Sequence, residues 1–250
     1  MCVLALAYDR HSRWRLVLAG NRDELHARPT AALHRWDGPG RVLAGQDLRS
    51  GGTWLGVSEE GRLAVVTNLR GFGPPEMERP SRGLLLRDLL AGEGDYAAPS
   101  DSDLDRFNPF NLFALTDGTL MFRSNRPAPQ RRVLGPGLYG ASNGPLDAPW
   151  PKTVRLKAAL DDWLQAGGER PETLLDALTD DQPPPVQAGP PSDAPEPPQT
   201  PIFIRNPLYG TRCSTVVAID RDGRGTIVER RYDAEGAATG ETALAFDWPW

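Results

Sequence analysis

Short apolar runs occur in pairs along this chain, and each pair is separated by a few residues that are typical of turns. The paired runs span residues 2–8 and 14–19, 53–58 and 62–68, 110–116 and 119–123, and 215–219 and 226–231. The third pair is joined by Asp117-Gly118, a dipeptide that favours the tight turn of a β-hairpin. The pattern predicts antiparallel hairpins rather than the alternating strands and helices of a parallel sheet.

Helical patterns are fewer and lie between the strand-rich parts. Ser81 is a good N-cap for a leucine-rich segment that ends at Gly92. Residues 152–166 place apolar side chains at helical spacing, and Pro171 suits the first turn of a further helix. Strands, a helical middle and strands again favour a layered α+β domain.

Proline is concentrated in one segment near the C-terminal third. Nine of the nineteen residues 183–201 are proline, and no apolar periodicity survives there. We expect a polyproline-like surface loop over residues 182–201, with a proline-motif ligand for a partner domain as the alternative. Because the strand pattern resumes at Ile202, we expect one domain over residues 1–250 that this loop interrupts.

Charge and cysteine content exclude several classes of protein. The net charge is −5, from 33 acidic and 28 basic residues, which argues against a nucleic-acid partner. Cys2 and Cys213 are too few for a disulfide framework, and no Cys/His spacing indicates a metal site. No apolar run is long enough to span a membrane, and Asp9 comes too early for a signal peptide. We expect a soluble cytoplasmic protein, and its oligomeric state stays open.

Motifs for nucleotide cofactors and histidine-based catalysis are not supported. The chain has no G-x-G-x-x-G and no Walker loop, which counts against dinucleotide and P-loop binding. Its histidines, His11, His26 and His34, all lie near the N-terminus and do not suggest a Ser-His-Asp triad.

Cys2 is the most informative position for chemistry. If Met1 is removed, Cys2 carries both a thiol nucleophile and an α-amine, whose ordinary pKa of about 7.7–8.0 lets it accept the thiol proton near neutral pH. The alternative is that Cys2 is simply a small apolar residue that begins a strand.

A polar cluster, Asn21-Arg22-Asp23-Glu24, follows the second apolar run directly. A hairpin would return this cluster beside residue 2, where Arg22 could stabilise a thiolate and Asp23 could hold the α-ammonium group. The alternative is a solvated turn.

Several short motifs, taken together and in order, resemble the NRDE (transport and Golgi organization 2) family. The motifs are Met1-Cys2, Asn21-Arg22-Asp23-Glu24, Gly51-Gly-Thr-Trp-Leu-Gly56, Thr67-Asn68, Tyr139-Gly-Ala-Ser-Asn143 and Tyr209-Gly-Thr-Arg-Cys-Ser-Thr215. The resemblance extends from residue 1 to about residue 230, apart from the proline-rich loop. This family is similar to the N-terminal nucleophile hydrolases of the bile-salt hydrolase and penicillin V acylase branch. That similarity implies a four-layer αββα sandwich of two antiparallel sheets between helical layers.

The resemblance also implies a set of site residues: Cys2, Arg22, Asp23, Asn68, Asn143 and Arg212. Cys2 would be the nucleophile and its amine the general base, with Arg22 supporting the thiolate and Asp23 orienting the amine. Asn68 and Asn143 would donate to the oxyanion, and Arg212 would add a second positive charge. The alternatives are turn chemistry for the two asparagines and an exposed strand position for Arg212.

Two positions depart from the acylase pattern. Its arginine and aspartate are separated by two residues, whereas Arg22 and Asp23 are adjacent. Neighbours on a regular strand point to opposite faces, so both can face Cys2 only if the chain bends or bulges. Cys213, beside Arg212, has no counterpart, and we expect it to be a buried packing residue.

Two functions follow from the resemblance. The first is a cysteine amidohydrolase or acyltransferase that acts on a small amide, a non-peptide C–N bond, through an acyl-enzyme and needs no cofactor. The second is a non-catalytic protein that binds and carries haem or acyl-CoA or another lipid in the same pocket. In both cases the partner is a small molecule.

Overall fold

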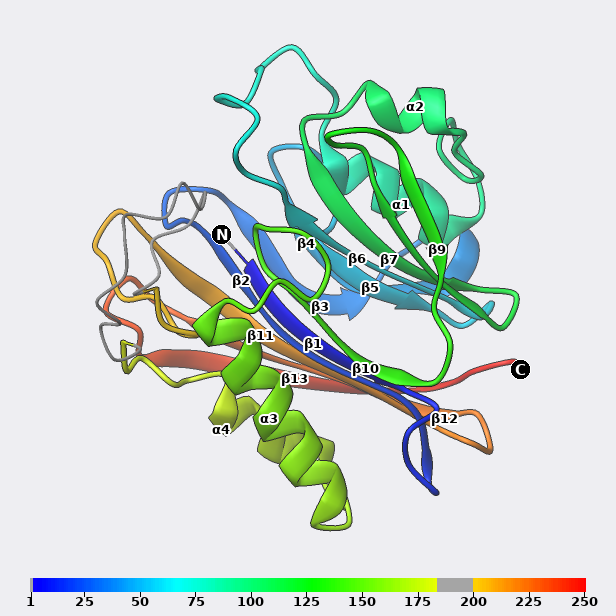
Figure 1. Cartoon of the computed structure of the whole chain (residues 1–250), viewed down its shortest axis with the longest axis vertical. Helices are drawn as coiled ribbons and strands as arrows, with labels where there is room; N and C mark the ends of the chain where they lie inside the picture. The colour runs from blue at the N-terminus through cyan, green and yellow to red at the C-terminus, as the bar shows by residue number, and fades with distance from the viewer. Residues whose placement is uncertain (1, 184–199) are drawn as a thin grey trace.

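The computed structural model describes residues 2–183 and 200–250, which form two antiparallel sheets (Figure 1). The first sheet has six strands in the order β10-β1-β2-β11-β12-β13. In that order, they span Gly137–Ala141, Cys2–Tyr8, Trp14–Leu25, Tyr209–Asp220, Arg224–Tyr232 and Ala238–Asp247. The predicted proline-rich loop lies mostly outside the described residues.

The second sheet has seven strands, and they follow one another in chain order from β3 to β9. They span Thr30–Arg35, Val42–Asp47, Leu55–Ser58, Arg62–Asn68, Phe110–Thr116, Thr119–Ser124 and Gln130–Val133. The helices are α1 (Arg82–Ala91), α2 (Asp101–Asp105), α3 (Pro151–Gln165) and α4 (Leu174–Ala177), with short 3₁₀ turns at Pro39–Arg41 and Pro171–Thr173.

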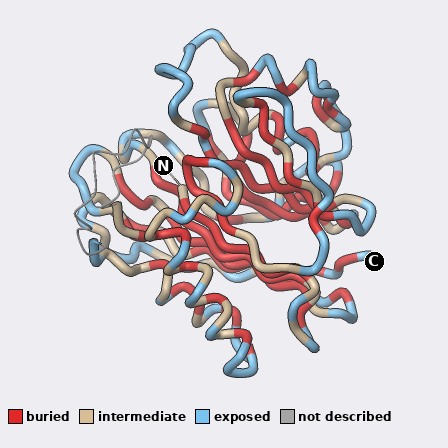
Figure 2. Tube along the Cα trace, in the orientation of Figure 1, coloured by how far each residue is buried: buried red, intermediate tan, exposed pale blue. Residues whose placement is uncertain are grey.

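The main core lies between the two sheets. Leu4, Leu18 and Val217 of the first sheet pack there with Leu63 and Phe113 of the second. Helices α3 and α4 cover the outer face of the first sheet, and α1 and α2 cover the outer face of the second (Figure 1). Figure 2 shows the strands buried between these layers. The arrangement confirms the expected αββα sandwich.

The predicted hairpins and helices are present. Strand pairs β1/β2, β5/β6, β7/β8 and β11/β12 are antiparallel neighbours. The Ser81 side chain accepts a hydrogen bond from the Gly83 N–H at the start of α1, and Gly92 ends the helix with φ 72°. Thr53 and Trp54, which we expected in a strand, precede β5.

Strands β3, β4, β9, β10 and β13 were not predicted. Strand β9 is exposed throughout, and β13 is an edge strand in which exposed residues alternate with half-buried ones. Strands of this kind need few apolar residues, so their sequences resemble loops.

Strand β2 continues through the polar cluster instead of ending before it. Its pairing with β1 places Cys2 opposite Arg22, and its pairing with β11 places Arg22 opposite Cys213. The three residues lie in one row across the first sheet, at the end where β1 begins. This row is the base of the candidate site.

Candidate active site

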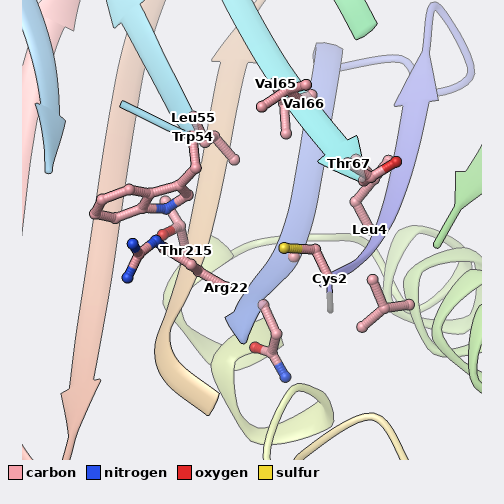
Figure 3. Close-up of a pocket in the computed structure, with 12 residues that line it drawn as sticks. Cys2, Leu4, Arg22, Trp54, Leu55, Val65, Val66, Thr67 and Thr215 are labelled. Carbon is pink, nitrogen blue, oxygen red and sulfur yellow. The ribbon is translucent and has the colours of Figure 1, made fainter. Parts of the chain in front are cut away.

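Cys2 lies on the face of the first sheet that packs against the second. Side chains two residues apart share a face, and Leu4 and Leu6 are core residues between the sheets. The Cys2 sulfur points into a cavity, toward the side where Arg22 and Trp54 lie (Figure 3). The cavity volume is about 10 Å³, which is about the minimum that can hold one water molecule.

The Arg22 guanidinium forms part of the cavity wall and is almost completely buried. It lies 4.4 Å from the centre of the Trp54 ring, and its Nη2 donates to Asp47 Oδ2 at 3.2 Å. Nη1 is buried and has no hydrogen-bond partner among the residues that the structure describes. The guanidinium is therefore fixed in place and keeps N–H donors available for an anion in the cavity.

Asp47 is the carboxylate that balances this arginine. It also accepts a hydrogen bond from Arg28 Nε at 2.5 Å. Burial alone would raise the pKa of Asp47, but the Arg28 hydrogen bond, the backbone N–H of Ser50 and the charges of Arg28 and Arg22 outweigh it and lower the pKa. Asp47 thus stays ionised and is a counterion rather than a proton acceptor.

The Gly-Gly-Thr-Trp segment explains how Trp54 reaches Arg22. A Cβ on Gly52 would lie 2.1 Å from the carbonyl carbon of Gly83, so only glycine lets this segment pack against the start of α1. A Cβ on Gly45 would lie 2.5 Å from the Trp54 ring. The two glycines therefore make room for the indole beside Arg22. Trp54 thus packs against the Arg22 guanidinium.

Asp23 is directed away from Arg22 by strand alternation. Its Oδ1 accepts a hydrogen bond of 2.6 Å from Thr211 Oγ1, which in turn accepts one from the Ile204 N–H. The pairing of β2 with β1 is regular at this point. A bulge is present, but it lies on β11, where Arg212 is the extra residue between the partners of Asp23 and Arg22.

Asn21 has a structural role in the same motif. Its side-chain NH₂ donates to the carbonyls of Leu178 and Ile202 at 2.8 and 2.9 Å. Its oxygen accepts a hydrogen bond from Ser214 Oγ at 2.7 Å. Asn21 therefore holds two segments of the outer layer against the first sheet.

Arg212 holds the turn that follows β2. Its Nη1 donates to the carbonyls of Leu25, His26 and Arg28 at 2.9, 2.9 and 3.2 Å. Burial and the nearby charge of Arg22 lower the pKa of Arg212. The Arg212 guanidinium is near Arg22, but the hydrogen bonds that it donates go to backbone carbonyls.

Asn68 and Asn143 are brought together. Asn143 is fully buried, and its Nδ2 donates to the backbone carbonyl of Asn68 at 2.7 Å. Asn68 is the last residue of β6 and is exposed. Asn143 thus fixes the main chain at the end of β6, beside Thr67, which lines the cavity (Figure 3).

Cys213 is buried, as we expected for a packing residue. Burial, together with the neighbouring carboxyl of Glu229, raises the pKa of its thiol well above the ordinary value. Burial also raises the pKa of Glu229, although the Leu33 N–H donates to Glu229 Oε1 at 2.8 Å. Cys213 is therefore a protonated thiol and a poor nucleophile.

Sequence reasoning missed three residues near the thiol: Asp47, Thr67 as a cavity residue, and Arg82. Asp47 ends a strand that was not predicted. Arg82 is the first residue of α1, and a negative charge on Cys2 would raise the pKa of its guanidinium. Their contacts join segments far apart in the chain, so no local spacing indicated them.

Metal sites and membrane helices are not found in the described part of the chain. No group of three or more His, Cys, Asp or Glu side chains within residues 2–183 and 200–250 could hold a metal ion. None of the helices described is long and apolar enough to cross a membrane.

Two solved structures share this fold. A Caenorhabditis elegans ortholog of N-acylethanolamine-hydrolyzing acid amidase has a TM-score of 0.52 and 15% identity, over 86% of this chain and 92% of that one. The C2A mutant of conjugated bile acid hydrolase from Clostridium perfringens has a TM-score of 0.53 and 10% identity, over 98% of this chain and 92% of that one. The fold is that of the N-terminal nucleophile hydrolases.

The sequence places the chain in a particular family within this fold. Residues 1–234 match the family model described as Transport and Golgi organisation 2, so the chain belongs to that family, as the NRDE resemblance indicated. The Transport and Golgi organization protein 2 homologs of Bos taurus and Homo sapiens are 33% and 31% identical, each over 92% of both chains.

Proposed function

We propose that this protein is an N-terminal cysteine amidohydrolase or acyltransferase that acts on a small amide. The observation that carries the proposal is the Cys2 thiol in a small cavity beside the buried guanidinium of Arg22. A buried arginine with unused donors favours a thiolate next to it. The fold shared with amide-hydrolysing proteins supports the same chemistry, although a fold alone does not define an activity.

The proposed reaction needs the α-amine of Cys2, which removal of Met1 exposes. The amine takes the proton from Sγ, and the thiolate attacks the carbonyl carbon of the amide. The C–N bond then breaks, and the leaving amine takes the proton back from the α-ammonium group. Water hydrolyses the remaining thioester and releases the acid and the thiol. A second amine in place of water gives acyl transfer.

The other residues of the proposed site support these steps. Arg22 stabilises the thiolate, and Asp23, which lies one residue further along β2, orients the α-ammonium group. The side-chain amide of Asn68 donates to the oxyanion, a contribution of about 2.7–4 kcal/mol for one such donor. Asn143 acts by holding the Asn68 main chain. Arg212 adds positive charge from its place on the turn after β2.

A second candidate function is a carrier that binds haem or acyl-CoA without turnover. The names of two relatives that match over 92% of both chains, Transport and Golgi organization protein 2 homologs, favour this candidate. A carried ligand would use the same pocket, with Cys2 as a neighbour or, for haem iron, as an axial ligand.

The Cys2→Ser variant separates the two functions. We expect it to lose amide hydrolysis, measured as amine release from a panel of small N-acyl compounds, while it retains binding of acyl-CoA or haem. Cys213→Ser is the matched control, because that thiol is buried and protonated. Hydrolysis by a correctly processed Cys2→Ser protein would contradict the enzymatic proposal.

A further inference from the structure

Arg82 lies at the start of α1, between two segments that flank the cavity. The Pro109 carbonyl accepts hydrogen bonds from Arg82 Nη1 and from the N–H of Leu69, which follows β6, both at 3.0 Å. The Ser81 side chain caps the helix, and the carbonyl of Gly83 accepts a hydrogen bond from the Thr53 N–H at 3.2 Å. The same Gly52–Gly83 packing that places Trp54 over Arg22 therefore also sets the position of Arg82. The helix is ten residues long and packs on the second sheet, so this position is rigid.

The guanidinium of Arg82 makes a single hydrogen bond to the described residues. Its Nη1 donates to the carbonyl of Pro109 at 3.0 Å, and no carboxylate of the described residues lies within 4 Å of it. Burial lowers the pKa of Arg82, while the charges of Cys2 and Glu24 raise it and that of Arg28 lowers it. Arg82 is thus a half-buried cation whose guanidinium makes one hydrogen bond to the described residues.

The carboxylates in this region form ion pairs with Arg22 and Arg28 and not with Arg82. Arg22 and Arg28 share Asp47 at 3.2 and 2.5 Å, and both lie 3.8 Å from Glu24. Arg212 donates to backbone carbonyls. Arg22, Arg28, Arg82 and Arg212 thus bring four guanidinium groups together in a chain whose net charge is −5, and the ion pairs of Asp47 and Glu24 involve only Arg22 and Arg28.

We propose that Arg82 is a specificity-determining residue that binds an acidic group, a carboxylate or a phosphate, of the small molecule that reacts at Cys2. The proposal rests on the proposed function of Cys2 as a nucleophile. A half-buried guanidinium loses less hydration on binding an anion than an exposed one does, and its planar donors match carboxylate and phosphate oxygens. A neutral amide could accept a hydrogen bond from Arg82 but would lack the charge attraction.

Two alkylating reagents of nearly the same size test this directly. Iodoacetate carries a negative charge and iodoacetamide does not, so the ratio of their rates at Cys2 isolates the charge effect from the reactivity of the thiol itself. We expect Arg82→Gln to lower the iodoacetate/iodoacetamide rate ratio about tenfold, equivalent to 1.4 kcal/mol. Arg82→Lys keeps the charge and should keep most of the ratio. Arg224→Gln, on a side chain 77% exposed at another edge, should leave the ratio unchanged.

The outcomes distinguish the two proposals. A Cys2 that reacts with neither reagent overturns the nucleophile itself. A Cys2 that reacts with both, at the same ratio in wild-type protein and Arg82→Gln, overturns the role of Arg82. Arg82→Met, which keeps the apolar stem, replaces the glutamine variant if that variant does not fold. Protection of wild-type Cys2 from iodoacetamide by acetate or by inorganic phosphate then shows which acidic group is preferred, and protection by neither contradicts the anion site.

Discussion

Replacing Trp54 by leucine removes the aromatic face against which the Arg22 guanidinium lies, at 4.4 Å from the ring centre. A desolvated cation–π contact contributes about 2 kcal/mol, and leucine keeps part of the apolar volume. The hydrogen bond from Arg22 to Asp47 remains. If the indole holds the guanidinium in the cavity wall, 2 kcal/mol corresponds to a fall of about 30-fold in the occupancy of that position. We therefore expect Cys2 to react with iodoacetamide about 10- to 30-fold more slowly.

The assay is the rate of Cys2 alkylation followed by intact mass, in wild-type protein, Trp54→Leu, Trp54→Phe, Arg22→Gln and the double variant Trp54→Leu/Arg22→Gln. Trp54→Phe keeps an aromatic face and should lose less. Since Trp54 acts through Arg22, adding Trp54→Leu to Arg22→Gln should change the rate little further. Additive effects of the two substitutions, in variants with unchanged thermal stability, would refute the positioning of Arg22 by Trp54.

Three further predictions concern stability. Gly52→Ala should lower the free energy of unfolding by about 1–3 kcal/mol because its Cβ has no space against Gly83, whereas Gly135→Ala, with nothing within 4 Å, should not; urea denaturation compares them. Asn21→Ala should cost about 1–3 kcal/mol in the same assay, because it leaves buried carbonyls without donors. Burial raises the pKa of Glu229 above 4.5, so the folded protein holds a proton that the unfolded chain has released. Wild-type stability should therefore fall relative to Glu229→Gln as pH rises above 4.5, and parallel stability curves would contradict this.

Local signals in the sequence were sufficient for much of the fold. Asp117-Gly118 and the apolar runs on either side define a hairpin, and Ser81 and Gly92 mark the two ends of α1. Strand β13 escaped prediction because an edge strand with one solvated side has no continuous apolar run. The exposed strands β9 and β13 were thus missed for lack of buried apolar residues, whereas β4 was missed although most of it is buried.

The site was predictable only where it lies on one strand. The alternation of β2 separates the motif into Arg22 on the cavity side and Asn21 on the outer side, and this follows from the two-residue period of a strand. Trp54 and Arg82 reach the site through the packing of one sheet on the other and of α1 on its loop. No periodicity within the chain encodes such contacts.

The central claim is that Cys2 is an activated N-terminal nucleophile, and the intact mass of untagged protein with and without a thiol-reactive acyl probe tests it most directly. The account predicts loss of Met1 and a single adduct, located on Cys2 and not on the buried Cys213. Retention of Met1, or a Cys2 that the probe does not modify, would contradict it.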